Sequence, residues 1–342
     1  MAGIPARKVA SAAAIGAGGL IAAGLTVAGA AFGQGLYAKR TIGVRNQSAP
    51  YADGLYGPKK RGTSIRFVML GDSSAAGLGA DSALDTVGAR LAQGLVDAAD
   101  TPVRYINMAT VGAKSVDLDE QVTRALLVKP QIVTIMIGAN DVTHLTPHKR
   151  ACDALGEAVE RLVVAGSEVV VGTCPDLGTI QPFLEPLRSV AKVSSGQLSK
   201  QQAVAVVEAG GRSVSLGSLL GPLFGSEPQE MFAADRFHPS SAGYAKAAEV
   251  LLPSMLDSLG LDPIDTDLNN EPIDEGVSSM TVAAELANVD AGTELVALDE
   301  AEQPDGDAKY WVRALRRVLR PVRRAEKPEP LSTDDYSEVA AM

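Results

Sequence analysis

Four short apolar runs constrain what this chain can fold into. Each is about six residues long, is rich in Val, Ile or Met, and lacks the polar–apolar alternation of a half-exposed sheet. Such runs are typical of parallel strands that are covered on both faces. The predicted strands are residues 65–70, 103–108, 132–137 and 168–173, with a fifth at 213–216.

Between these strands the spacing of apolar residues changes to that of helices. The predicted helices are residues 82–99, 115–127, 151–165, 197–209 and 241–257. Regular alternation of strands and helices implies a parallel sheet with right-handed crossover connections, and therefore an α/β fold.

A serine follows the first predicted strand directly, in Gly71-Asp72-Ser73. Open α/β sheets bind ligands at the carboxyl edge of the strands, where this hydroxyl lies. Far downstream, Asp235 precedes His238 by three residues, and Pro239 restricts His238 to an extended conformation. A serine, a base and an acid that orients the base are the three parts of a serine hydrolase.

Two further polar stretches follow the second and third strands. They are Asn107-Met108-Ala109-Thr110-Val111-Gly112 and Gly138-Ala139-Asn140-Asp141. The four segments that contain Ser73, Gly112, Asn140 and the Asp235–His238 pair occur in this order along the chain. In this respect residues 64–258 resemble the SGNH (GDSL-type) hydrolase family. The resemblance implies a three-layer α/β/α sandwich of flavodoxin-like type with a five-stranded parallel sheet. In the α/β-hydrolases, by contrast, the serine follows several strands and the acid and histidine lie far apart.

The resemblance also implies roles for single residues. Ser73 is the expected nucleophile, His238 the base and Asp235 its orienting acid. The expected oxyanion donors are the backbone N–H groups of Ser73 and Gly112 and the side chain of Asn140. Gly112 has no side chain to block its amide, and Asn140 carries two N–H donors.

Other features of this region carry smaller expectations. Asp72 and Asp141 are expected to hydrogen-bond backbone amides in their turns. Ser74 stands where many family members carry Leu, so substrate preference does not transfer to this chain. The resemblance implies a serine esterase without metal or organic cofactor, acting on a small acyl ester of a lipid or an acetylated sugar. A thioesterase or lysophospholipase of the same fold, and a non-catalytic binding module anchored at the cell envelope, are the alternatives.

The remaining histidines and the cysteines are predicted to lie outside the chemistry. His144 and His148 are four residues apart, but Pro147 lies between them and no carboxylate completes a metal site. Cys152 and Cys174 lack the Cys-x-x-Cys spacing of a zinc site. A disulfide between them and two buried free thiols are both compatible with the sequence.

The N-terminal region contains a long uncharged segment. Residues 9–38 contain no charged side chain and are flanked by basic residues on both sides. About 20 apolar residues suffice to cross a bilayer as a helix. Residues 1–40 are therefore predicted to be a secretory signal peptide or a transmembrane signal-anchor, and residues 41–63 a linker. Both predictions send the enzyme domain to the cell membrane or outside the cytoplasm; a weaker alternative keeps it cytoplasmic.

The C-terminal region differs in charge from the rest. Residues 261–342 carry 19 acids and 8 bases, which leaves the remainder of the chain nearly neutral, without a basic stripe suited to nucleic acid. Residues 259–308 are acidic and are predicted to be disordered or loosely attached. Residues 309–342 are predicted to contain a basic amphipathic helix and a tail. Residues 311–324 of that helix have two possible partners, a membrane surface and the protein's own acidic tail or domain.

Overall fold

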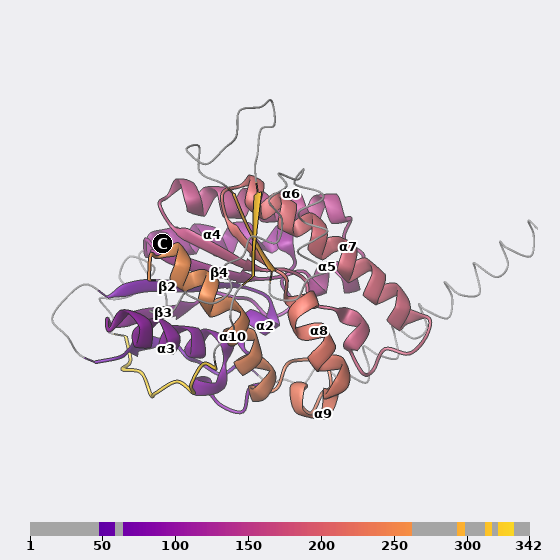
Figure 1. Ribbon diagram of the computed structural model, residues 1–342, viewed down its shortest axis with the longest axis horizontal. Coiled ribbons are helices and arrows are strands. Elements are labelled where there is room, and N and C mark those ends of the chain that lie inside the picture. Colours follow the sequence, from indigo (N-terminus) through magenta and orange to yellow (C-terminus); the bar gives the residue numbers. More distant parts are fainter. Residues whose placement is uncertain (1–47, 59–63, 262–292, 298–311, 317–320, 332–342) are drawn as a thin grey trace, which may run out of the picture.

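A computed structural model describes residues 48–58, 64–261, 293–297, 312–316 and 321–331 of the chain (Figure 1). Its centre is a sheet in which eight described strands follow the order β1-β3-β2-β4-β5-β6-β7-β8. The five central strands are parallel, and their bounds agree with the sequence prediction to within one or two residues. They are β3 (Val103–Asn107), β2 (Ile65–Gly71), β4 (Ile132–Met136), β5 (Glu168–Gly172) and β6 (Arg212–Val214).

Three antiparallel strands extend this sheet at its two edges. β1 (Gly54–Tyr56) pairs with β3, β7 (Thr293–Ala297) pairs with β6, and β8 (Val312–Arg316) pairs with β7. β1 lies inside the predicted linker 41–63, and β7 lies inside the acidic segment 259–308, so both predictions are wrong at these residues.

The predicted amphipathic helix over residues 311–324 is also wrong where the structure describes it. Residues 312–316 form a strand, and residues 321–324 have no regular secondary structure. A helix would leave the edge of β7 unpaired, whereas a strand satisfies its backbone groups, and Pro321 interrupts any helix at this point.

Helices cover both faces of the sheet (Figure 1). One layer holds α3 (Val87–Ala99) and α10 (Ser241–Ser258), and the other holds α4 (Leu118–Leu127), α6 (His148–Val164) and α7 (Leu187–Glu208). Shorter elements are α2 (Ser73–Ala76), α5 (Ala139–Thr143), α8 (Leu216–Ser226), α9 (Pro228–Met231), η1 (Ala83–Asp85), η2 (Ser115–Asp117) and η3 (Leu177–Thr179). The predicted three-layer α/β/α sandwich is confirmed.

The two faces of the sheet build two separate hydrophobic clusters. Phe67 and Met69 of β2 belong to the cluster beneath α3 and α10, whereas Val68 and Leu70 belong to the cluster beneath α4 and α6. Because successive side chains of a strand point to opposite faces, both faces must be apolar, which explains the continuous apolar run.

A C-terminal strap, residues 321–331, lies against the α3 layer. Its Val322 and Ala325 are buried, and its Arg324 forms an ion pair with Asp85 of η1 at 2.8 Å. Leu55 and Glu329 exchange backbone hydrogen bonds of 2.8 and 2.9 Å, which adds a bridge to β1. The strap therefore joins residues of the C-terminal region to the far edge of the sheet.

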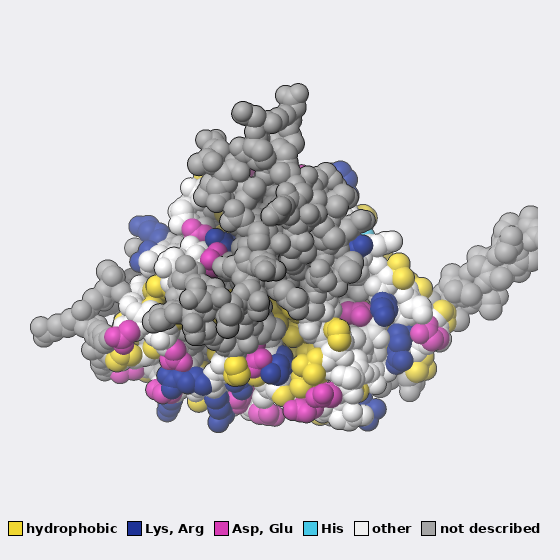
Figure 2. Space-filling model, viewed as in Figure 1, with side chains coloured by type: hydrophobic (Ala, Val, Ile, Leu, Met, Phe, Trp, Pro, Cys, Tyr) yellow, Lys and Arg dark blue, Asp and Glu magenta, His cyan; other side chains and the backbone are white. Residues whose placement is uncertain are grey.

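The surface over the α3 and α10 layer carries charged side chains of both signs, intermixed (Figure 2).

None of the helices in the described part of the chain is long and apolar enough to cross a membrane. The uncharged segment 9–38 lies outside the described residues.

Candidate active site

Ser73 is held in place by the tight end of β2. The preceding Gly71 has a φ of +132°, and a Cβ atom there would lie 1.9 Å from the carbonyl oxygen of Met136, so only glycine fits. The buried side chain of Gln121 accepts from the Gly71 N–H at 2.8 Å and donates to its carbonyl at 2.9 Å. Ser73 then opens α2 at the carboxyl edge of the sheet, as predicted.

Asp72 caps the helix that Ser73 begins. Its Oδ1 accepts a hydrogen bond from the Ser74 N–H at 2.9 Å, which confirms the expected structural contact. The pKa of Asp72 is raised to about 6, chiefly by burial and in part by the neighbouring Asp141, while the backbone amides and His238 oppose this shift. A carboxyl group that is only partly ionised in mildly acidic solution therefore lies next to the serine.

His238 links the serine to an acid from a distant part of the chain. Its Nε2 lies 3.0 Å from the Oγ of Ser73, and its Nδ1 lies 2.7 Å from the Oδ2 of Asp235. The predicted contact between residues 73 and 238 is thus confirmed. With Nδ1 protonated, the ring donates to Asp235 and can accept the serine proton at Nε2, the tautomer that these partners require.

The loop before α10 fixes this pair by its backbone. Oδ1 of Asp235 accepts from the N–H groups of Phe237 and His238 at 2.9 and 3.0 Å. Burial raises the pKa of Asp235, but the hydrogen bonds from His238 and these two amides outweigh it, so the net pKa lies below the ordinary value. Asp235 is therefore a carboxylate at neutral pH.

Gly79 allows the histidine loop to approach the segment after α2. It has a φ of +103°, and a Cβ atom would lie 2.6 Å from the carbonyl oxygen of Pro239 and 3.0 Å from the Cβ of His238. Ser240 then caps α10 by accepting from the backbone amides of Ala242 and Gly243.

The two expected oxyanion residues lie on connected segments. One amide hydrogen of Asn140, in α5, is donated to the carbonyl of Ala113 at 3.0 Å, so Asn140 contacts the loop that carries Gly112. That loop is joined to the end of β2, because the Thr110 N–H donates to the Gly71 carbonyl at 3.0 Å. A Cβ atom on Gly112 would meet no atom within 4 Å, which leaves its surroundings open for a ligand.

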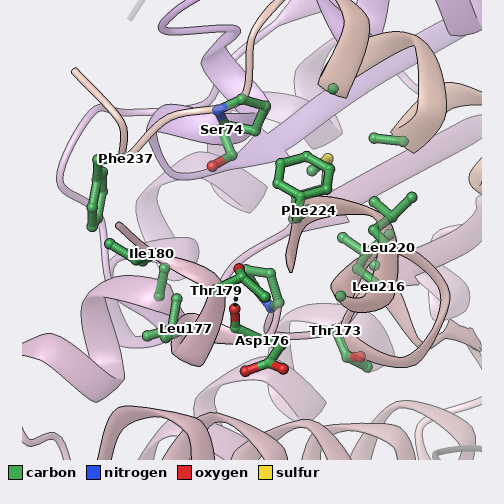
Figure 3. Close-up of a pocket in the computed structure, with 18 of the residues that line it drawn as sticks. Ser74, Thr173, Asp176, Leu177, Thr179, Ile180, Leu216, Leu220, Phe224 and Phe237 are labelled. Atoms are coloured by element: carbon green, nitrogen blue, oxygen red, sulfur yellow. Dashed lines mark hydrogen bonds between the residues drawn. The ribbon is translucent and has the colours of Figure 1, made fainter. Parts of the chain in front are cut away.

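An apolar pocket lies next to the serine turn and is lined by Asp72 and Ser74, the two chain neighbours of Ser73 (Figure 3). Ser74 and Phe237 lie at one end of it, while α8 supplies much of the opposite wall. The apolar side chains that line it include Leu177, Ile180, Leu216, Leu220, Phe224 and Phe237. The helix α8 was not predicted from the sequence, because Gly or Pro interrupts its apolar repeat at four positions. The available signal was the five Leu or Phe residues within its eleven positions.

The two cysteines and the two remaining histidines make structural contacts. Cys152 and Cys174 are both free and buried, so the disulfide alternative is wrong. Burial raises the pKa of the Cys152 thiol to about 12, which keeps it protonated. His144 bonds the Asn140 carbonyl at 2.9 Å and His148 bonds Ser194 at 3.1 Å, and the described residues contain no cluster of metal-binding side chains.

Comparisons with known proteins identify a curated relative and several solved structures that are similar to this chain. The chain is 37% identical over 278 residues to the GDSL-like esterase Rv1075c of Mycobacterium tuberculosis, which covers 77% of this chain and 88% of that protein. Solved structures with a similar fold include the lipase Lip_vut3 from a goat rumen metagenome, 16% identical with a TM-score of 0.46, covering 59% of this chain and 100% of that one. Another is a variant of Axe2, an acetyl xylan esterase from Geobacillus stearothermophilus, 19% identical with a TM-score of 0.43, covering 60% and 99%.

The family model of the GDSL-like lipase/acylhydrolases matches residues 69–246, which include the serine, the glycine loop, the asparagine and the Asp–His pair. Together with the curated relative, this match places the chain among the carboxylic ester hydrolases. The chain belongs to the GDSL-like lipase/acylhydrolase family.

Proposed function

We propose that the protein hydrolyses acyl esters through a covalent acyl-enzyme on Ser73. The observation that carries this proposal is the hydrogen-bonded series Ser73–His238–Asp235, with contacts of 3.0 and 2.7 Å. A serine hydroxyl is a weak nucleophile unless a base accepts its proton, and the imidazole of His238 is within the range required for that transfer.

The proton follows the bonds of this series. Nε2 of His238 takes the hydroxyl proton as the Ser73 Oγ attacks the ester carbonyl. The resulting imidazolium is stabilised by the carboxylate of Asp235, and it gives the proton to the departing alkoxide. A water molecule then attacks the acyl-enzyme by the same route in reverse, which releases the acid and restores the hydroxyl.

The oxyanion is assigned to three donors: the N–H groups of Ser73 and Gly112, and the second amide hydrogen of Asn140. The open space next to Gly112 and the contact between Asn140 and Ala113 support this assignment. The loss of one such donor lowers kcat by about 100- to 1,000-fold in serine hydrolases. Asn140→Ala is therefore expected to lose activity within that range while KM changes little.

The apolar pocket supports a substrate with an apolar acyl chain over an acetylated sugar. Its walls are formed by Leu and Phe side chains of α8 and by Leu177 and Ile180, surfaces that a single acetyl group would leave largely uncovered. A series of p-nitrophenyl esters tests this preference. We expect kcat/KM to rise from acetate to chains of intermediate length, and Leu220→Trp, which fills the pocket, to shift the optimum back toward acetate.

The nucleophile has its own test. Ser73→Ala is expected to abolish hydrolysis of short nitrophenyl esters, whereas a chelator such as EDTA leaves the activity of the unaltered chain intact. Full activity of the Ser73→Ala variant would refute the mechanism.

We also propose that the enzyme domain works at the cell membrane or outside the cytoplasm. The support is the uncharged segment 9–38, which lies between basic residues in the sequence. Fractionation of cells that express the full chain tests this proposal, with activity expected in the membrane or exported fraction. Activity confined to the cytosol would contradict it.

A further inference from the structure

Exposed large apolar side chains are unevenly distributed over this protein. Among the described residues, seven are at least half exposed: Tyr51, Val111, Leu145, Val164, Leu184, Val190 and Val193. Single exposed apolar residues are normal on any protein surface and need no explanation. A concentration of them at one edge of the fold does need one.

Topology brings six of the seven to the carboxyl edge of the sheet. Val111 follows β3, Leu145 follows β4 and α5, and Leu184 lies between β5 and α7. Val190 and Val193 are on the first two turns of α7, which begins at the same edge. Tyr51 precedes β1, whose antiparallel course starts beside the end of β3. These six residues are named the apolar rim.

The apolar rim shares its edge with the proposed nucleophile. Ser73 follows β2 at this edge, and the Ser195 hydroxyl of α7 accepts from the N–H of Leu177, so α7 is joined to the wall of the apolar pocket. Val164, by contrast, ends α6 at the opposite edge and is 81% exposed. It serves as a matched control for the rim.

Leu145 is the least expected member of the rim. The N–H groups of Leu145 and Thr146 bond the carbonyls of Val142 and Asp141, which is the helix-ending arrangement that usually has glycine at the position of Leu145. Leu145 has a φ of +55°, a conformation that costs an L side chain energy, and it is 85% exposed. Neither the left-handed backbone conformation nor burial favours a leucine at this position. Backbone strain that the fold does not explain often marks a functional residue.

The N-terminal part of the chain enters the fold at the same edge. Oδ1 of Asp53 accepts from the Asn107 N–H at 3.0 Å, and the Asn107 side chain donates to the Ala75 carbonyl of α2 at 2.9 Å. Two hydrogen bonds therefore connect this entry point to the helix that Ser73 begins. Residues 39–52, between the uncharged segment 9–38 and Asp53, span at most about 50 Å when fully extended.

From these observations we propose that the apolar rim lies against a lipid bilayer, so that the carboxyl edge of the sheet faces the membrane. An apolar rim of five aliphatic side chains and one tyrosine, at the point where the chain leads to a long uncharged segment, fits the surface of a bilayer. A further consequence, which rests on the proposed esterase function, is that Ser73 takes its ester substrate from the membrane surface.

A fluorescent label on the full chain tests lipid contact without any reference to catalysis. Val193→Cys and Val164→Cys would each carry an environment-sensitive bimane, because the two native cysteines are buried and react poorly. With phosphatidylcholine vesicles, we expect a blue shift and a rise in intensity at position 193 and no change at position 164. Equal responses at both positions, or none at 193, would overturn the proposal. A shift at 193 that depends on protein concentration without vesicles would also overturn it, in favour of a second copy of the chain.

A variant that relieves strain separates lipid contact from damage to the fold. Leu145→Asn replaces the leucine with a residue that tolerates positive φ. We expect its thermal midpoint to stay the same or rise, and kcat/KM on a soluble nitrophenyl ester to stay within twofold. Hydrolysis of an ester lipid in phosphatidylcholine vesicles should fall about fivefold, because the variant loses the contribution of one aliphatic side chain to membrane binding. The control variant Val164→Ser should change the rate in neither assay. Unchanged hydrolysis in vesicles would contradict the role of the rim. Loss of activity in both assays for Ser73→Ala reports only on the proposed chemistry.

Discussion

The carboxylate of Asp141 accepts two hydrogen bonds from Ser115, from its N–H at 3.0 Å and from its hydroxyl at 2.8 Å. Both residues are fully buried. Asp141 follows Asn140 in α5, and Ser115 follows the loop of Gly112, so this pair holds together the two segments that carry the proposed oxyanion donors. Asp141 is thus a positioning residue that acts through its neighbours.

The variant Asp141→Ala tests this role. It leaves the Ser115 donors buried without their acceptor, so we expect stability to fall by about 3 kcal/mol. Because the proposed oxyanion donors of Gly112 and Asn140 then lose their fixed separation, kcat should fall about 100-fold with a smaller change in KM. Asp141→Asn keeps one acceptor oxygen and should recover most of kcat. The exposed pair of Ser189 and Glu185 offers the control, since Ser189→Ala should alter neither quantity. A loss of stability with kcat unchanged would limit Asp141 to the fold.

The buried Asp72 makes a pH-dependent prediction. Its pKa of about 6 in the folded protein exceeds its ordinary value of 3.8, chiefly through burial. Between pH 4 and 6 the native state therefore binds more protons than the unfolded state, and this group lowers stability as pH rises. Asp72→Asn stays neutral and retains the oxygen that caps α2.

Urea denaturation at two pH values measures this effect. At pH 7 the Asp72→Asn variant should be more stable than the unaltered protein by up to about 3 kcal/mol, and at pH 3.5 the two should be alike. A difference that does not depend on pH would show that burial does not perturb this carboxyl group.

The C-terminal strap gives a comparison between adjacent arginines. Arg324 pairs with Asp85, whose side chain is only 9% exposed, whereas Arg323 pairs with the more exposed Asp97. Burial raises the pKa of Asp85, but the hydrogen bonds from Ser82 and Arg324 and the charges of Arg324 and Arg90 lower it overall. The stabilisation from this carboxylate is therefore present at neutral pH and is lost as pH falls through its lowered pKa.

Two single variants use this difference. Arg324→Ala should lower the free energy of unfolding by about 1 kcal/mol at pH 7, with a smaller deficit in acid, while Arg323→Ala should change it by less than about 0.5 kcal/mol. Chemical denaturation of both variants at pH 7 and pH 3 measures these differences. Equal deficits for both arginines would show that the strap makes no specific contact with η1.

Local patterns in the sequence predicted the central fold and singled out the residues of the candidate site. The five parallel strands are continuous apolar runs, and the base and its acid are only three residues apart, so both were recognisable without knowledge of tertiary contacts. Ser73 was predicted to be the partner of His238 because it lies at the end of a strand, and the carboxyl ends of all parallel strands meet at one edge of the sheet.

The missed features depend on contacts between distant residues. β1 is a strand only because it pairs with β3, and β8 only because it pairs with β7. The basic residues around β8 favour a helix by composition, yet pairing at a sheet edge overrides that preference. The C-terminal strap has no periodic pattern at all, and its place is set by Asp85 and by the backbone of Leu55.

The central claim is that His238 activates Ser73, and covalent labelling tests it most directly. The protein would be treated with a fluorophosphonate and the modified peptide identified by mass spectrometry, for the unaltered chain and for His238→Ala. We expect one adduct, on Ser73, forming at least about 1,000-fold more slowly in the variant. Labelling of another residue, or labelling of Ser73 at the same rate without His238, would contradict the account.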